Sequence, residues 1–196
     1  MTSLTLNLNS LIKLTPEQFY QLCLDNPDLK LERNAQGELI IMPPTGGETG
    51  RCNVNLIVQI ALWNEQIQLG EVFDSSTGFT LPNGADRSPD VSWLEKSRWQ
   101  ALTKQQREKF LPLCPDFVIE IMSPSDNLLK IQEKMNEYRS NGCRLGWLIN
   151  RKKEEVEIYR PEQLVEVLKL PASLTGENVL PGFVINLQKI WLQKIW

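Results

Sequence analysis

Apolar residues fall into short runs and helical stripes along this chain, and the pattern predicts alternating strands and helices. The run from Asp116 to Met122 is mostly apolar and β-prone, with the length of a strand covered on both faces. A helix follows, and one face of it carries a stripe at i, i+3, i+7 and i+10, formed by Leu128, Ile131, Met135 and Tyr138. Gly146 to Asn150 is a second strand. The stretch is therefore a strand, a core-facing helix and a strand.

Local signals predict where that helix begins and ends. In SPSD, Ser123 suits the N-cap, Pro124 the first helical position and Asp126 the place of a capping acid. Gly142 suits the C′ position that closes a helix. These residues predict a helix from Ser123 to just before Gly142.

The chain before this stretch predicts a helix, a hairpin and a longer helix. Thr15 to Asn26 has a Thr N-cap followed by Pro. LKLER and ELIIMP read as a hairpin around Asn34 to Gly37. Glu48 to Gln68 is amphipathic, with Glu48 in its first turn. Its apolar face is predicted from Val54, Ile57, Ala61 and Trp63.

Strand-like patterns flank the central stretch on both sides. EVFDSSTGFTL is one such run, and after Pro82-Asn83-Gly84 a strand restarts at Asp90 to Leu94. Residues 97–110 are mostly polar and predict a surface helix or loop. VEIYRP and LVEVLKLP alternate like an edge hairpin, and GFVINL follows. The order predicts one α/β domain, residues 1–196, in which two long helices sandwich a mixed sheet.

Composition narrows the chemistry that this domain can perform. The 196 residues include no histidine, which excludes Ser-His-Asp and Cys-His catalysis and most zinc hydrolase sites. The four cysteines are Cys23, Cys52, Cys114 and Cys143, and their wide spacing predicts buried thiols without zinc or disulfides. A net charge of -3 argues against non-specific coating of nucleic acid. Carboxylates, Lys, Tyr, Ser and Cys remain as reactive groups.

No apolar run is long enough to span a bilayer, and the N-terminus lacks the basic region of a secretory signal. We therefore expect a cytoplasmic protein that does not enter a membrane.

Glu120 is the first candidate for chemistry, because a buried carboxylate is costly unless it is paired or bound to a metal. Lys134 lies about 40° from Tyr138 around the helix, at the edge of the apolar stripe, so its ammonium can approach the strand. Asp90 on a neighbouring strand and Glu48 complete the hypothesis. Clustered carboxylates repel one another unless a cation such as Mg²⁺ or Mn²⁺ neutralises them. Such a site suits phosphodiester hydrolysis without histidine.

Each residue also has a purely structural interpretation. Asp90 follows Pro89 and suits a turn or the start of a strand, and Glu120 suits a buried ion pair. Lys134 suits a surface lysine, and Lys130 competes with it for the same role. Glu48 suits the helix dipole.

The order of the motifs resembles the Uma-two family of restriction-endonuclease-like proteins with the PD-(D/E)XK fold. The resemblance rests on PDVSWL, PDFVIEIMSPSD, the pair Lys134 and Tyr138, and NGCRLGWLIN, and it covers nearly the whole chain. It implies a restriction-endonuclease-like mixed sheet flanked by helices, with added N- and C-terminal hairpins.

The resemblance also implies roles for single residues. Asp90 and Glu120 become metal ligands, and Glu48 matches the acidic residue of the first core helix. The nuclease pattern expects lysine two residues after the glutamate, where this chain has Met122, and Lys134 takes that role from the following helix. Two further departures, Asn150 for Asp and Cys143 for Val, do not touch the proposed ligands.

Three functions follow as hypotheses. The first is a metal-dependent nuclease that hydrolyses DNA, and the second is a catalytically inactive module that binds nucleic acid or protein. The third is a phosphodiesterase acting on a small nucleotide, which a closed pocket would favour over an open groove. A homodimer is also expected, with Trp191 and Trp196 of the apolar tail at its interface.

Overall fold

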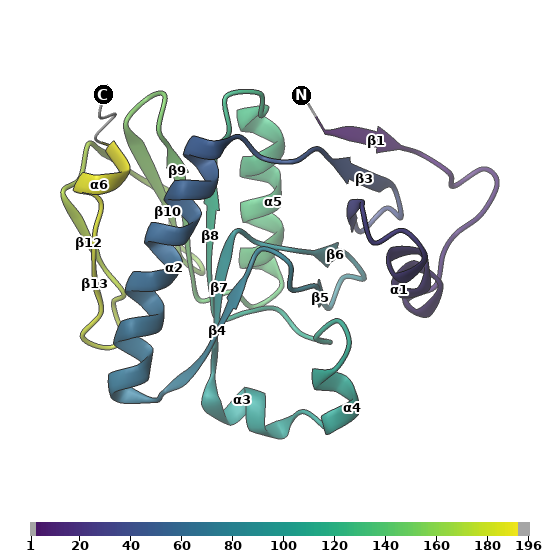
Figure 1. Cartoon of the computed structure of the whole chain (residues 1–196), viewed down its shortest axis with the longest axis horizontal. Helices are drawn as coiled ribbons and strands as arrows, with labels where there is room; N and C mark the ends of the chain where they lie inside the picture. The colour runs from purple at the N-terminus through teal and green to yellow at the C-terminus, as the bar shows by residue number, and fades with distance from the viewer. Residues whose placement is uncertain (1–2, 192–196) are drawn as a thin grey trace.

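A mixed sheet of six strands forms the centre of the computed structural model, which describes residues 3–191 (Figure 1). In sheet order the strands are β11 (Glu166–Lys169), β10 (Glu155–Tyr159), β9 (Leu145–Asn150), β8 (Phe117–Ile121), β7 (Val91–Glu95) and β4 (Gly70–Asp74). β8 and β9 run parallel, and the other neighbours are antiparallel. One core packs α2 (Gly47–Ile67) against the sheet, and a second packs α5 (Leu128–Ser140) against it. The predicted α/β arrangement is confirmed.

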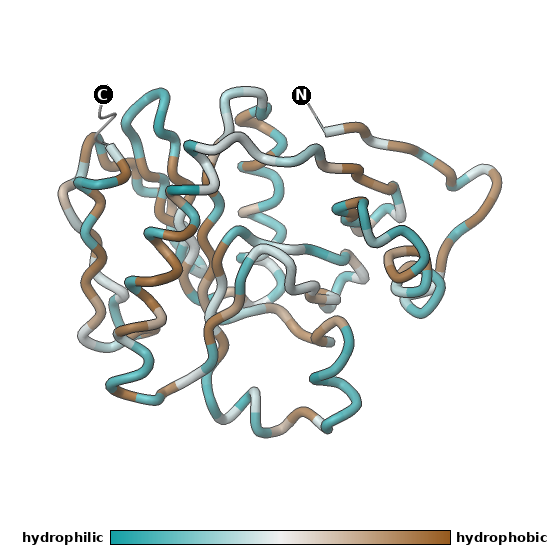
Figure 2. Tube along the Cα trace, in the orientation of Figure 1, coloured by the Kyte–Doolittle hydropathy of each residue, from teal (hydrophilic) through white to brown (hydrophobic). Residues whose placement is uncertain are grey.

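Alternation along β8 decides which side chains face which helix. Phe117, Ile119 and Ile121 belong to the core on the α2 side, whereas Val118 belongs to the core on the α5 side. Because side chains in a strand alternate, Glu120 shares the face of Val118 and points toward α5. The hydrophobic stretches of the central strands run between the two helices (Figure 2).

The predicted apolar stripe of α5 is confirmed, but its predicted start is wrong. Met135 and Tyr138 are buried, and Leu128 and Ile131 pack against the same core. The helix begins at Leu128, because the Asn127 side chain accepts a hydrogen bond from Leu129 N.

The four residues SPSD form a turn in front of α5. Asp126 Oδ2 accepts a hydrogen bond from Ser123 N at 2.7 Å, and Asp126 N donates to Ser123 O at 3.1 Å. The aspartate thus satisfies a nearby backbone donor and closes a turn, which competes with helix formation. At the other end the prediction holds, since Gly142 follows the C-cap with a φ of 103°.

The long helix α2 is confirmed, and its predicted apolar face is correct in part, since Ile57 and Trp63 pack against the sheet-side core. Cys52, Leu56 and Ile60 are fully buried, whereas Val54 is 61% exposed. Several apolar residues lie on both sides of this helix, so periodicity alone did not decide which stripe faces the sheet.

A second sheet is formed mainly by the N-terminal part of the chain. Its strands, in order, are β1 (Leu4–Leu6), β3 (Leu39–Met42), β2 (Lys30–Arg33), β6 (Asp86–Arg87) and β5 (Phe79–Thr80). The hairpin predicted around Asn34 to Gly37 is confirmed as β2 and β3. The helix predicted after Thr15 is confirmed as α1 (Pro16–Asp25), with a capping box between Thr15 and Gln18.

The run EVFDSSTGFTL is not one strand, and β6 was not predicted. Asp74 Oδ1 accepts hydrogen bonds from Ser76 N and Ser76 Oγ, which turns the chain after β4. The remainder becomes β5, and it pairs with β6 in the second sheet.

Short elements complete the fold. They are α3 (Lys96–Ala101), α4 (Lys104–Arg107), β12 (Ser173–Thr175), β13 (Val184–Asn186) and α6 (Gln188–Trp191). The segment at 97–110 is helical and at the surface, and the edge hairpin is confirmed as β10 and β11. Trp191 packs against the protein's own core and donates a hydrogen bond to Pro171 O, so it is committed within the chain. Trp196 lies outside the described residues.

Within residues 3–191, no helix combines the length and the hydrophobicity needed to cross a bilayer.

Candidate functional site

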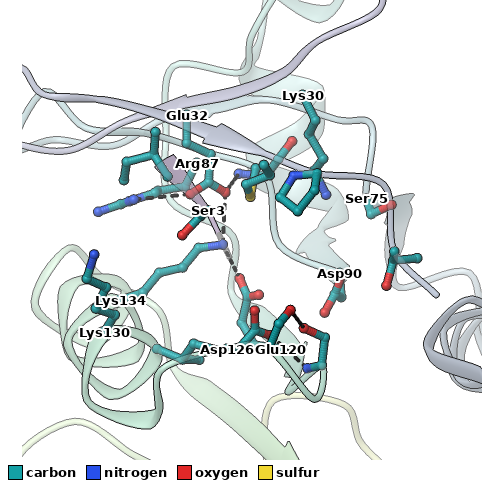
Figure 3. A pocket seen from close by; sticks show the side chains of 18 of the residues that line it. Ser3, Lys30, Glu32, Ser75, Arg87, Asp90, Glu120, Asp126, Lys130 and Lys134 are labelled. Carbon is teal, nitrogen blue, oxygen red and sulfur yellow. Dashed lines mark hydrogen bonds and ion pairs between the residues drawn. The ribbon is translucent and has the colours of Figure 1, made fainter. Parts of the chain in front are cut away.

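A cavity of about 960 Å³ lies where the N-terminal sheet meets the end of β8 and α5 (Figure 3). The ionisable and polar side chains at its centre come from β2, the first turns of α2, the segment before β7, β8 and α5. Its lining includes Glu32, Asn53, Arg87, Asp90, Glu120 and Lys134. Three of the four charged residues predicted from distant parts of the sequence, Asp90, Glu120 and Lys134, therefore share one cavity.

Lys134 is the centre of this cluster. Its Nζ lies 2.7 Å from Glu120 Oε1 and 2.8 Å from Glu32 Oε1, and its side chain is only 12% exposed. Figure 3 shows the ammonium between the two carboxylates. The helix-edge position predicted for Lys134 explains this, since its stem crosses packed surface while its charge reaches the strand.

Glu120 is held by Lys134 and by Tyr138, whose hydroxyl donates to Glu120 Oε1 at 3.0 Å. Its residue exposure is 7%. Burial raises the pKa of Glu120 to about 7, because the nearby charges of Asp90 and Glu32 add to the desolvation that Lys134 offsets only in part. Glu120 therefore gains or loses its proton near neutral pH.

Glu32 on β2 was not predicted as a site residue. It contacts Lys134 and also Arg87 at 3.1 Å, and it accepts a hydrogen bond from Ser88 N at 2.9 Å. Burial alone would raise the pKa of Glu32, but the two cations outweigh burial and lower it to about 2. Glu32 is thus the ionised partner that neutralises Lys134, and Arg87 continues the network to Glu137 at 2.5 Å.

Asp90 directly precedes β7. Its Oδ2 accepts a hydrogen bond from Ile121 N at 2.8 Å, and its Oδ1 accepts one from Asn53 Nδ2 at 3.2 Å. The antiparallel pairing of Val91 with Ile119 brings Asp90 beside the end of β8, next to Glu120. Asp90 is therefore both a strand-start residue and part of the cavity wall, as Figure 3 shows.

The structure does not bring Glu48 to this cluster. Its carboxylate lies 3.1 Å from Arg51 and 3.2 Å from Arg151, and its side chain is 65% exposed. Thr49 and Asn53, one turn apart on α2, line the cavity instead. Successive helix positions are rotated by about 100° from each other, so Glu48 points away from the cavity that Thr49 and Asn53 line, and no acidic residue of α2 lines it.

Lys130 also lines the cavity, but its side chain is exposed. Of the two lysines on α5, Lys134 is the one that pairs with the strand glutamate.

Among residues 3–191, no three or more His, Cys, Asp or Glu side chains are arranged as a ready metal-binding group. Asp90 and Glu120 do converge, and beside them Asn53 Oδ1 is buried with no hydrogen-bond partner among the described residues. The oxygen donors are all hard ligands of the kind that Mg²⁺ and Mn²⁺ prefer.

Comparison with known proteins assigns the chain to a family. A family profile matches residues 16–188, and its description reads "Uma2: Putative restriction endonuclease". The chain belongs to the Uma2 family. This confirms the resemblance found in the sequence motifs. No curated protein matches the chain.

A solved structure supports the Uma2 fold independently. It is titled as a putative nuclease belonging to DUF820 from Anabaena variabilis ATCC 29413, with 21% sequence identity and a TM-score of 0.76. The match covers 91% of this chain and 97% of the other. The restriction-endonuclease-like fold of this Uma2 chain is thereby shown.

Sequence reasoning found three of the residues that the cavity brings together, Asp90, Glu120 and Lys134. It missed Glu32 and Arg87, because no sequence motif around either residue indicates a functional site.

Proposed function

We propose that this protein is a nuclease that hydrolyses DNA phosphodiester bonds with the help of Mg²⁺ or Mn²⁺. The observation that carries the proposal is the position of Lys134, whose buried ammonium lies beside Glu120 in the cavity that Asp90 also lines. A buried cation beside two acidic groups suits a phosphoryl oxygen that gains negative charge during hydrolysis.

The donor set fits a divalent cation. Asp90 and Glu120 supply carboxylate oxygens, and Asn53, whose Nδ2 donates to Asp90 Oδ1, has a further hard oxygen, its Oδ1, with no partner among the described residues. The raised pKa of Glu120 is partly caused by the charge of Asp90, and a bound cation relieves that repulsion. Asp90 and Glu120 would hold the metal, which when bound polarises a phosphoryl oxygen and acidifies its water.

The chain's own residues prepare the site. Tyr138 donates a hydrogen bond to Glu120 and fixes its carboxylate on the α5 side of β8. Ile121 N and Asn53 hold both oxygens of Asp90. Lys134 orients the attacking water or stabilises the charge that develops on the phosphate. Glu32 keeps Lys134 charged and in place.

A cleavage time course tests the proposal. Plasmid and single-stranded DNA are incubated with Mn²⁺ or Mg²⁺ and the wild type, Lys134→Ala, Lys130→Ala or Asp90→Asn. We expect Lys134→Ala to slow cleavage by on the order of 100-fold, the scale seen when a transition-state donor is lost. Lys130→Ala is the matched control from the same helix and should change only salt-sensitive binding.

Lack of cleavage by the wild type under either metal would reject the nuclease. A larger defect in Lys130→Ala than in Lys134→Ala would reject the assigned role of Lys134.

A binding module without catalysis is the second candidate, and one observation favours it. Lys134 Nζ lies 2.7 Å from Glu120 and 2.8 Å from Glu32, so the three side chains also form a complete structural ion-pair network. Retention of DNA by a wild type that cleaves nothing, unchanged by EDTA, would favour this candidate.

A further inference from the structure

The solvent-facing side of α2 carries an apolar stripe. Val54 is 61% exposed, Val58 46% and Leu62 56%. At about 100° per residue, Val54 and Leu62 each lie within about 40° of Val58 around the helix axis. The three side chains therefore form one continuous row along two turns.

This row is separate from the face that packs on the sheet. Leu56 and Ile60 are fully buried and lie about 160° from Val58 around the helix. α2 is thus hydrophobic on two opposite sides, and a helix that is apolar all round is normally covered on both sides. The central sheet covers one of them (Figure 1).

Charges of opposite sign close the two ends of the row. Arg51 precedes Val58 by seven residues and Glu65 follows it by seven, and both are exposed. Each lies within about 20° of Val58 around the axis. The two ends of the row are therefore equally far from Val58, and one end is positive while the other is negative.

We propose that this row is a docking surface for a second copy of this chain, with the two α2 helices antiparallel about a twofold axis at Val58. In that register Val58 meets Val58 of the other copy, and Val54 meets Leu62. Arg51 meets Glu65, and symmetry makes that contact twice. A twofold interface must be self-complementary, and a row whose charge reverses across its midpoint meets that condition.

The charge pattern selects this partner. A parallel pair would place Arg51 against Arg51 and Glu65 against Glu65, which is unfavourable. Arg51 contacts Glu48 and donates a long hydrogen bond to Lys189 O at 3.5 Å, and its ion pair joins side chains that are 46% and 65% exposed, so it is weak enough to exchange for a contact with Glu65. The inference replaces the expected tail interface, since Trp191 is held within its own chain. It does not depend on the proposed nuclease activity.

Sedimentation and light scattering of the full chain over a dilution series test the inference. We expect a wild-type mass of twice 22.5 kDa that falls to one chain on dilution. Val58→Asp places two carboxylates together on the twofold axis and should give one chain at every concentration. Val167→Asp is the matched control, since Val167 is a valine of 55% exposure on the edge strand β11. It should keep the wild-type mass.

A charge exchange then tests the register. Arg51→Glu and Glu65→Arg should each raise the dissociation constant by about ten-fold, because each creates two like-charge contacts. The double variant R51E/E65R should restore the wild-type value, because it exchanges the two charges and keeps both contacts between opposite charges. A monomeric wild type, or a dimer that survives Val58→Asp, overturns the proposal. A double variant no better than its single parents overturns the antiparallel register.

Discussion

Glu32 gives the sharpest test of how the buried charges are balanced. Its side chain is 3% exposed and contacts two cations, and these lower its pKa from an ordinary 4.5 to about 2. That difference corresponds to about 3 kcal/mol of folding free energy. Replacing Glu32 by Gln keeps the shape and removes the charge. We expect Glu32→Gln to lower the free energy of unfolding by about 3 kcal/mol at pH 7.

The effect has a defined pH window. A carboxyl group whose pKa is lowered in the folded state stabilises the protein fully above its unfolded pKa, near 4.5, and loses that contribution as the pH falls toward about 2. The difference between wild type and Glu32→Gln should therefore be constant from pH 7 down to about 5 and shrink below that.

Urea unfolding followed by tryptophan fluorescence at several pH values measures this difference. Glu133→Gln on α5 is the control, because Glu133 is an exposed carboxylate beside the same cavity. It should change stability by less than about 0.5 kcal/mol. A Glu32→Gln effect that stays the same from pH 7 to pH 3 would refute the assignment of Glu32 as the ionised partner of Lys134.

Three further outcomes follow from the same cluster. Mn²⁺ at a hundred-fold excess over its Kd should raise the free energy of unfolding by about 2.7 kcal/mol, which corresponds to roughly 5–10 °C in Tm. Asp90→Asn should abolish that shift and lose little stability in EDTA. The Mn²⁺ shift should grow as the pH rises through about 7, because Glu120 must lose its proton to bind metal, and a shift that is flat from pH 6 to 8 would contradict the raised pKa. Tyr138→Phe removes a donor to Glu120, so it should cost about 1 kcal/mol and move the pH midpoint of Mn²⁺ binding upward, whereas an unchanged midpoint would show that the hydroxyl does not act on Glu120.

Local periodicity was enough to predict much of the fold and part of the site. The stripe on α5 placed Lys134 at the helix edge. In β8, Glu120 was recognisable as the one carboxylate within an apolar strand. Both predictions rest on contacts within one helix or one strand, where residue spacing determines direction.

The remaining site residues depend on tertiary structure. Glu32 lies in an ordinary alternating strand, and only the packing of the N-terminal sheet against α5 brings it to Lys134, 102 residues later. The predicted start of α5 was wrong because an Asp side chain suits a helix cap and a turn equally well, and Asp126 forms a turn. Glu48 lies on the helix that contributes Thr49 and Asn53 to the cavity, but the rotation between successive helix positions turns its side chain away.

The long sequence separations in the ion-pair cluster bear on the order in which the protein assembles. Tyr138 and Glu120 are 18 residues apart and meet once β8 and α5 have packed, whereas Lys134 meets Glu32 only after the N-terminal sheet has docked. Closing the longer loop costs more chain entropy, so we expect the contact with Glu32 to form after the contact between Tyr138 and Glu120. Until then Lys134 has one carboxylate partner and Arg87 lacks Glu32. During refolding, the packing of α5 on β8 should therefore precede the recovery of a working cavity.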